Sequence, residues 1–136
     1  MANLTNPEAF QFEAATILAA AYTAFPVPFD WALDEDAEGY PTTQGHGRKE
    51  IQNRTLEWLE IHRYLGSDSV SDEDGWYNLK LTERGLAALN AVPDVLSGRE
   101  PLGKRLAVAV GRNSLDVIKQ LIPTLISQAL GGEQIG

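Results

Sequence analysis

The sequence predicts an α+β fold, built from several helices and one β-hairpin and closed by a C-terminal helical pair. Apolar residues recur at helical spacing over residues 10–22, 51–65 and 115–130. Two short strand-like runs flank an Asp74-Gly75 pair, which favours a tight hairpin turn. The length of 136 residues suits one domain of ordinary size, and 43% of the residues are hydrophobic and can supply its core.

The composition excludes several classes of protein. The chain contains no cysteine, which excludes disulfides, thiolate metal sites and a cysteine nucleophile. No basic leader precedes the first apolar stretch, and polar residues interrupt the longest apolar runs before they reach the roughly 20 residues of a membrane helix. We therefore expect a cytoplasmic protein that does not span a membrane.

The charges are distributed unevenly along the chain. The net charge is −8, and residues 1–47 contain seven acids but no lysine or arginine. An acidic protein repels phosphate at long range, so nucleic-acid binding would require a local basic surface. The densest basic group has no aromatic or Gly-rich context, and we expect it to solvate an apolar tail and to pair with acids. Its members are Arg99, Lys104, Arg105 and Arg112.

The first predicted helix covers residues 6–24. Asn6 is expected to cap it, since Pro7 is favoured at the first helical position and Glu8 suits the positive end of the helix dipole. Residues 25–28 read Phe-Pro-Val-Pro and end the helix, because a residue before proline disfavours the helical conformation. The apolar residues that follow are expected to pack on this helix: Phe29, Trp31 and Leu33.

Residues 34–47 are rich in Asp, Glu, Gly and Thr and are expected to form a solvated acidic loop. The stretch from Asp34 to Gly39 approaches the pattern of a calcium loop. The pattern fails at its twelfth position, where Gly45 replaces the bidentate glutamate that would close the site. We therefore predict no metal site, and we interpret His46 as an exposed loop residue.

The second predicted helix runs from Arg48 to Leu65 and ends at Gly66, where glycine favours a left-handed cap. At about 100° per residue, its buried face includes His62, which we interpret as a packed core residue and not as a ligand or a catalyst. The buried face consists of Ile51, Thr55, Trp58, His62 and Leu65, and the opposite face of Lys49, Glu50, Asn53, Glu57, Glu60 and Tyr64.

The predicted hairpin joins residues 69–70 to residues 76–81, with Tyr77, Leu79 and Leu81 alternating as one apolar face. Three consecutive carboxylates stand at its tip, where they would oppose contact with phosphate.

The third predicted helix is capped by Thr82, and Glu83 suits its first turn. Here the sequence resembles a known family. The pattern Y-x-L-x-L-T-x-x-G-x-x-x-L at residues 77–89, preceded by a helix containing Trp-Leu-Glu, resembles the wing strand and following helix of bacterial winged-helix proteins of the MarR and PadR type. This resemblance implies a winged-helix-like domain over residues 1–96. The layout also resembles uncharacterised bacterial proteins with a winged-helix-like core, and that resemblance implies no activity.

In a DNA-reading winged helix, the second helix would be the recognition helix. Its outward face should then be rich in basic and amide side chains, but here three acids outnumber one lysine. A regulator would place against DNA the residues near the start of this helix, which are Arg48, Lys49, Asn53 and Arg54.

Residues 97–136 are predicted to form a helical extension that serves in dimerisation. One helix covers residues 102–110, and a longer helix follows, capped by Asn113 with Asp116 three residues on. Apolar residues cover about 220° of the longer helix, whereas packing on its own domain needs about 100°. Either other helices cover the surplus or a second subunit does, and we expect a homodimer. Pro123 should kink or split the helix. The expected interface consists of Leu115, Ile118, Ile122, Leu125, Ile126 and Ala129.

No phosphate loop, zinc-protease motif or nucleophile elbow is present in the sequence. We therefore expect no catalytic residue and no cofactor. The first functional hypothesis is a non-enzymatic protein-interaction and dimerisation module. The alternative is a winged-helix DNA-binding transcriptional regulator. A third hypothesis is small-ligand sensing between the core and the tail helices, with Trp31, Trp58 or Tyr22 lining the site.

Overall fold

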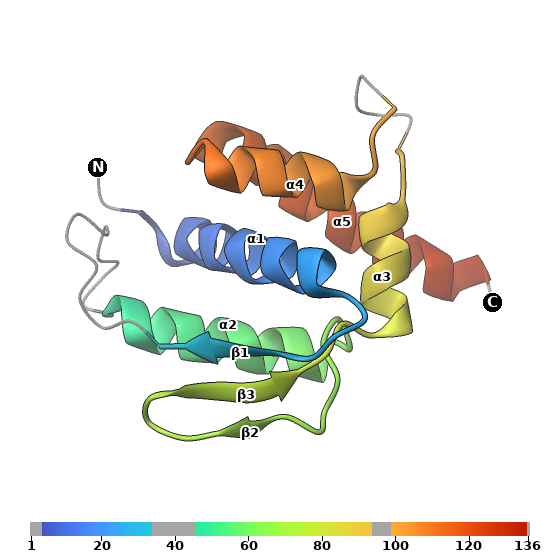
Figure 1. The fold of residues 1–136 in the computed structure, drawn as a ribbon. Helices are drawn as coiled ribbons and strands as arrows, with labels where there is room; N and C mark the ends of the chain where they lie inside the picture. Colours follow the sequence, from blue (N-terminus) through green and yellow to red (C-terminus); the bar gives the residue numbers. More distant parts are fainter. Residues whose placement is uncertain (1–3, 34–45, 94–98, 136) are drawn as a thin grey trace.

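The computed structural model describes residues 4–33, 46–93 and 99–135 and confirms the α+β class. Within these ranges five helices accompany an antiparallel sheet of three strands. Helix α1 lies between two layers, with α4 and α5 on one side and α2 with the sheet on the other (Figure 1). The elements are α1 (Asn6–Ala24), β1 (Phe29–Ala32), α2 (Arg48–Ile61), β2 (Val70–Ser71), β3 (Gly75–Leu79), α3 (Glu83–Asn90), α4 (Leu102–Gly111) and α5 (Leu115–Ile135).

The cap of α1 is Thr5 and not Asn6. The Thr5 hydroxyl accepts the backbone N–H of Glu8 at 3.3 Å, and the Glu8 carboxylate accepts the backbone N–H of Thr5 at 2.9 Å. This reciprocal pair is a capping box, which requires Ser or Thr followed three residues later by Glu or Gln. The spacing Thr5 to Glu8 satisfies it, whereas Asn6 is already helical.

Helix α2 ends at Ile61 and not at Leu65, because Arg63 adopts a left-handed conformation with φ 67°. The N–H of Arg63 donates to the carbonyl of Glu60 at 3.1 Å, and the N–H of Tyr64 donates to that of Leu59 at 2.8 Å. This bond pair is a Schellman motif, here built on arginine in place of the predicted Gly66.

The early end of α2 changes which residues are buried. Tyr64 and Leu65 leave the helix and enter the core, each 1% exposed, so the placement of Tyr64 on the outer face is wrong. His62 is exposed, so its interpretation as a core residue is also wrong. The buried face of the helix itself consists of Gln52, Thr55, Leu56 and Leu59.

The sheet has the order β1-β3-β2, with both pairs antiparallel. The sequence predicts only that Phe29 and Trp31 pack on α1, but both lie in strand β1. The partner of this strand, β3, lies more than forty residues further along the chain. The hairpin turn is Asp72 to Gly75, closed by the Asp72 N–H donating to the Gly75 carbonyl at 3.0 Å, and is centred one residue earlier than predicted. A Cβ at position 75 would lie 2.7 Å from the Trp31 carbonyl oxygen, so the close approach of β1 explains why this residue is glycine.

A bulge in β3 overturns the predicted apolar face. Asn78 has φ 62°, and the pairing of β1 with β3 shifts beside it. Its N–H donates to the Asp30 carboxylate at 3.1 Å. Because the bulge adds one residue, Trp76 and Leu79 are both buried while Tyr77 between them is exposed.

Helix α3 begins as predicted. The Thr82 hydroxyl accepts the N–H of Gly85 at 2.9 Å and donates to the carbonyls of Arg63 and Tyr64. The cap therefore also joins α3 to the segment that leaves α2. A Cβ on Gly85 would lie 2.5 Å from the Tyr64 carbonyl oxygen, so only glycine permits this approach.

The C-terminal helices meet at a second Schellman motif. Asn113, with φ 56°, ends α4: its N–H donates to Val110 at 3.0 Å, and that of Ser114 donates to Ala109 at 2.9 Å. Asn113 therefore does not cap α5, which begins at Leu115. Helix α5 continues through Pro123 as one helix, so the proline does not split it.

One hydrophobic core joins the helices on both sides of the predicted domain boundary. Buried residues of α1, α2 and α3 belong to the same cluster as buried residues of α4 and α5. The boundary itself, between residues 96 and 97, lies outside the described residues, as does the calcium-like stretch 34–45. No helix in the described ranges has the length and apolar character needed to cross a bilayer.

Candidate interaction surfaces

The first candidate surface is the start of α2, which carries the four residues predicted to face DNA. Arg48 is turned toward α1, where its Nε donates to the Glu13 carboxylate at 3.2 Å. Glu13 is fully buried and also accepts the side-chain N–H of Gln52 at 3.3 Å. A buried carboxylate requires such partners, so Arg48 anchors two helices to each other and is committed to the protein interior.

The other predicted DNA-contacting residues also meet protein groups. The Asn53 side-chain oxygen accepts the indole N–H of Trp76 at 2.8 Å, which joins α2 to β3. Arg54 forms an ion pair with Glu57 at 3.1 Å on the exposed face. Lys49 lines a cavity of about 550 Å³ between α2 and the hairpin, together with Asp72 and other residues of mixed charge.

The hairpin tip is acidic and exposed. Its three carboxylates, those of residues 72–74, all lie at the surface. The Asp72 carboxylate accepts the N–H of Asp74 at 2.8 Å, the N–H of Gly75 at 3.0 Å and the Tyr77 hydroxyl at 3.2 Å. These donors, the Asp74 N–H first, lower the pKa of Asp72, so its negative charge persists beside the start of α2.

A smaller cavity of about 300 Å³ lies between the start of α1 and α2. Its aromatic wall is Trp58, whose ring lies 5.0 Å from that of Phe10 and 4.1 Å from that of His62. His46 also lines it and pairs with Glu50 at 3.0 Å, so this histidine has a carboxylate partner. The lining residues are Asn6, Phe10, His46, Glu50, Ile51, Arg54, Thr55 and Trp58.

The space between the core and the tail helices is filled where Tyr22 lies. The Tyr22 ring packs so closely on α4 that a Cβ on Gly103 would meet it at 2.7 Å. Its hydroxyl donates to the Asn90 side chain at 3.1 Å. This contact leaves no room for a ligand between α1 and α4, which counts against the ligand-sensing hypothesis at that position.

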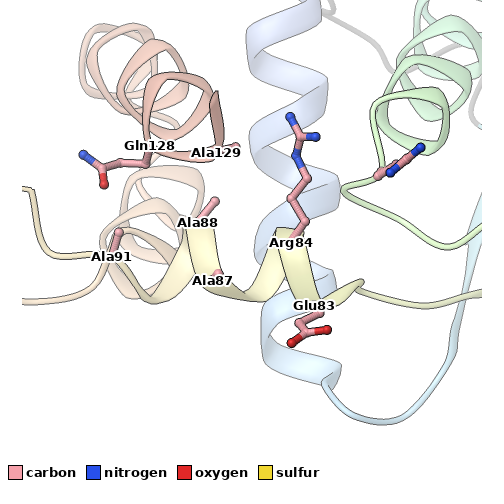
Figure 2. A pocket seen from close by; sticks show the side chains of 8 residues that line it. Glu83, Arg84, Ala87, Ala88, Ala91, Gln128 and Ala129 are labelled. Atoms are coloured by element: carbon pink, nitrogen blue, oxygen red, sulfur yellow. The ribbon is translucent and has the colours of Figure 1, made fainter. Parts of the chain in front are cut away.

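The second candidate surface is a groove between α3 and α5 with a volume of about 560 Å³ (Figure 2). Its lining includes alanines of α3 and α5 and the alanine that follows α3. Arg84 stands upright from α3, and its guanidinium carbon lies 5.5 Å from the centre of the Tyr64 ring. The groove is lined by Arg63, Glu83, Arg84, Ala87, Ala88, Ala91, Gln128 and Ala129.

Sequence reasoning missed this groove. The available signal was the spacing of Ala87, Ala88 and Ala91, which gives α3 a face of small residues. Such a face does not show whether a neighbouring helix fills it, and α5 fills it only in part.

Most of the residues expected in a dimer interface lie in the interior of the chain itself. Ile118, Ile122, Leu125 and Ala129 are at most 7% exposed, and Leu115 and Ile126 are partly buried. Helices α1, α3 and α4 cover this face of α5. The large apolar side chains that α5 leaves exposed in the described residues are Val117 and Leu130.

In the predicted basic group, Lys104 has an acidic neighbour. Lys104 lies 3.7 Å from Glu100, one turn away. Within the described residues no cluster of three or more His, Cys, Asp or Glu could hold a metal ion.

Comparisons with family models, with curated proteins and with solved structures find no match to this chain.

Proposed function

We propose that this chain is a non-enzymatic module with a winged-helix-like core that works by binding protein, itself included. The observation that carries the proposal is the groove between α3 and α5, which is lined in part by alanines and left open by its own fold. Exposed apolar grooves of this size are typical of surfaces that bind a helix or a peptide.

The contacts at α2 support protein binding over DNA binding. Arg48 contacts the buried Glu13 and Asn53 accepts the Trp76 indole N–H, whereas Arg54 forms an exposed ion pair with Glu57. A phosphate contact would have to break these contacts and approach the acidic hairpin tip.

The second candidate is a winged-helix transcriptional regulator. The hairpin that directly follows α2 supports it, because the winged-helix resemblance expects a wing after the recognition helix. In that case Lys49 and Arg54, at the exposed start of α2, would be the residues nearest to DNA.

Fluorescence anisotropy with a labelled random-sequence duplex separates the two candidates. Non-specific phosphate binding strengthens steeply as salt falls, so a regulator should bind at about 20 mM salt and weaken at about 150 mM. We expect no binding at either concentration.

The variants Lys49→Glu and Arg54→Glu refine this test, since neither residue is buried. Lys104→Glu on α4 is the matched control for loss of one cation. Suppose that binding weakens as salt rises and weakens further in the two α2 variants but not in the control. This result would favour the regulator over the interaction module.

A further inference from the structure

Helix α4 presents a basic face to the solvent, in the layer opposite to the acidic hairpin (Figure 1). Its other side contacts α1, α3 and α5 and buries Leu102, Gly103, Leu106 and Ala109. At about 100° per residue, Lys104, Val108 and Arg112 lie within about 80° of one another, and Arg105 borders them. The first three are exposed and Arg105 is half-buried. The outer face of α4 therefore consists of three cations around one exposed apolar side chain.

These cations have little acid near them. Lys104 lies 3.7 Å from Glu100, whereas Arg105 and Arg112 form no ion pair in the part of the chain that the structure describes. Residues 99–112 contain four cations and this one acid, in a chain whose net charge is −8. At about 0.15 M salt, charges more than about 8 Å away are largely screened. A partner at the outer face of α4 therefore meets a positive surface, although the protein as a whole is acidic.

A positive face with an apolar centre is complementary to carboxylates arranged around an apolar side chain. We propose that the outer face of α4 binds an acidic segment of another protein. Its carboxylates contact Lys104, Arg105 and Arg112, and its apolar side chain packs on Val108. This inference rests on the proposed function, since the partner is a protein, and it assigns a binding surface separate from the α3–α5 groove.

The dimensions of the face fit a short segment. Lys104 and Arg112 are eight positions apart, which corresponds to about 12 Å along a helix. Exposed acids bound the face at both ends, because Glu100 precedes α4 and Asp116 lies in the first turn of α5. A duplex or a bilayer extends beyond this length and would bring its phosphates toward these two carboxylates, whereas a segment of a few residues would not.

The apolar content of the face also disfavours a bilayer. Val108 is 46% exposed and is the only large apolar side chain that the described α4 exposes. A helix that lies in a membrane interface buries a whole apolar face in the lipid, but the apolar face of α4 is occupied by the core of its own chain.

Fluorescence anisotropy with a labelled acidic peptide tests the proposal. The probe has about twelve residues, enough to span the face as a helix or extended, with pairs of Glu alternating with Leu. The control peptide has Gln in place of Glu. We expect the Glu peptide alone to bind at about 150 mM salt, and its affinity to fall toward about 500 mM.

Charge reversal locates the binding on α4. Lys104→Glu combined with Arg112→Glu changes two exposed positions and should weaken binding of the Glu peptide at least about tenfold. Lys49→Glu combined with Arg54→Glu on α2 is the matched control. It changes the net charge equally and should leave the affinity within about twofold.

Zero-length cross-linking gives an independent position for the peptide. A carbodiimide couples a carboxylate to an amine in contact with it, and Lys104 is the one lysine of α4. Mass spectrometry of the digested adduct should find the Glu peptide on Lys104 in preference to Lys49.

The outcomes separate this inference from the function on which it rests. No binding of the Glu peptide, equal loss in the two double variants, or equal coupling to Lys49 and Lys104 overturns the assignment of α4 and leaves the α3–α5 groove unaffected. Binding of a random duplex or of phosphatidylserine vesicles that is lost in the α4 variant overturns the acidic protein partner in favour of phosphate. The proposed function fails separately, through duplex binding that depends on Lys49 and Arg54.

Discussion

At the scale of single residues, several acids that add to the negative charge of the chain also hold parts of the fold together. Glu8 closes the capping box of α1 and reaches Lys119 of α5 at 2.8 Å. Glu13 joins α1 to α2 from within the core, and Asp72 organises the hairpin turn. The acidic composition predicts a solvated surface, whereas these three carboxylates have structural partners.

Glu8 gives the chain an acid-sensitive contact. The hydrogen bond from Lys119, together with those from Thr5, lowers the pKa of Glu8 from 4.5 to about 2. A depressed folded-state pKa stabilises the fold above the unfolded-state value, and this stabilisation disappears as pH falls from 4.5 toward 2. Glu8→Gln keeps the capping pattern but removes the charge, so its melting temperature should be lower than wild type at neutral pH and converge with it in acid.

Thermal unfolding followed by circular dichroism across this pH range checks the Glu8 prediction. Glu100→Gln, which removes the partner of Lys104 at 3.7 Å, is the control and should show no converging difference. A Glu8→Gln deficit that stays constant down to pH 2 would show that the carboxylate charge contributes nothing.

Three of the departures from the sequence-based predictions, at the end of α2, in β3 and at the end of α4, occur at residues with a left-handed backbone conformation. Arg63, Asn78 and Asn113 have positive φ, a conformation that asparagine adopts more readily than most side chains but that costs a residue such as arginine about 1–2 kcal/mol. Nothing local in the sequence indicates that Arg63 bears this cost. The left-handed conformation of Arg63 is tolerated because the burial of Tyr64 and Leu65 depends on the turn that it makes.

At the scale of elements, helices with strong local signals were predictable and elements defined by distant contacts were not. The cap at Thr82 and the extent of α4 are confirmed because capping and periodicity are local properties. Strand β1 was missed because it has four residues and gains its structure by pairing with β3. The end of α2 was misplaced because the tertiary anchor at Tyr64 overrides the helical pattern.

Gly85 carries the contact between α3 and the segment after α2. Gly85→Ala would place a Cβ 2.5 Å from the Tyr64 carbonyl oxygen and 2.8 Å from a Leu81 methyl group. Overpacking of this kind should lower the free energy of unfolding by about 2 kcal/mol, in spite of the better helix propensity of alanine. Urea denaturation monitored by tryptophan fluorescence measures the change.

Gly111→Ala is the matched control for Gly85→Ala. A Cβ on Gly111 meets no atom within 4 Å, so alanine should be neutral or stabilise the chain by up to about 1 kcal/mol. Equal effects of the two substitutions would contradict the role assigned to the close approach at Gly85.

At the scale of the whole molecule, the C-terminal helices complete the core that α1 begins. The sequence predicts surplus apolar surface on α5 and leaves open whether other helices or a second subunit cover it. The structure covers most of it within the chain and leaves Val117 and Leu130 exposed among the large apolar side chains described on α5. A helical wheel specifies how much of a helix is apolar but not which neighbour covers each side.

The net charge makes a prediction about how the proposed dimer responds to salt. Two copies that each carry −8 repel each other at long range, and salt screens this repulsion. The dissociation constant of the dimer should therefore decrease between about 20 mM and about 150 mM salt. Sedimentation equilibrium at both concentrations checks the sign, and an increase would show that attraction between opposite charges at the contact outweighs the overall repulsion.

The shortness of the outer strands protects the chain against amyloid-like stacking. Strand β2 has two residues and leads into the acidic turn, while β1 has four residues, follows Pro28 and carries Asp30. A fibril would have to extend the sheet through these edges, which offer few free backbone groups and place carboxylates beside them. Edge-to-edge association through the described sheet is therefore disfavoured at both β1 and β2.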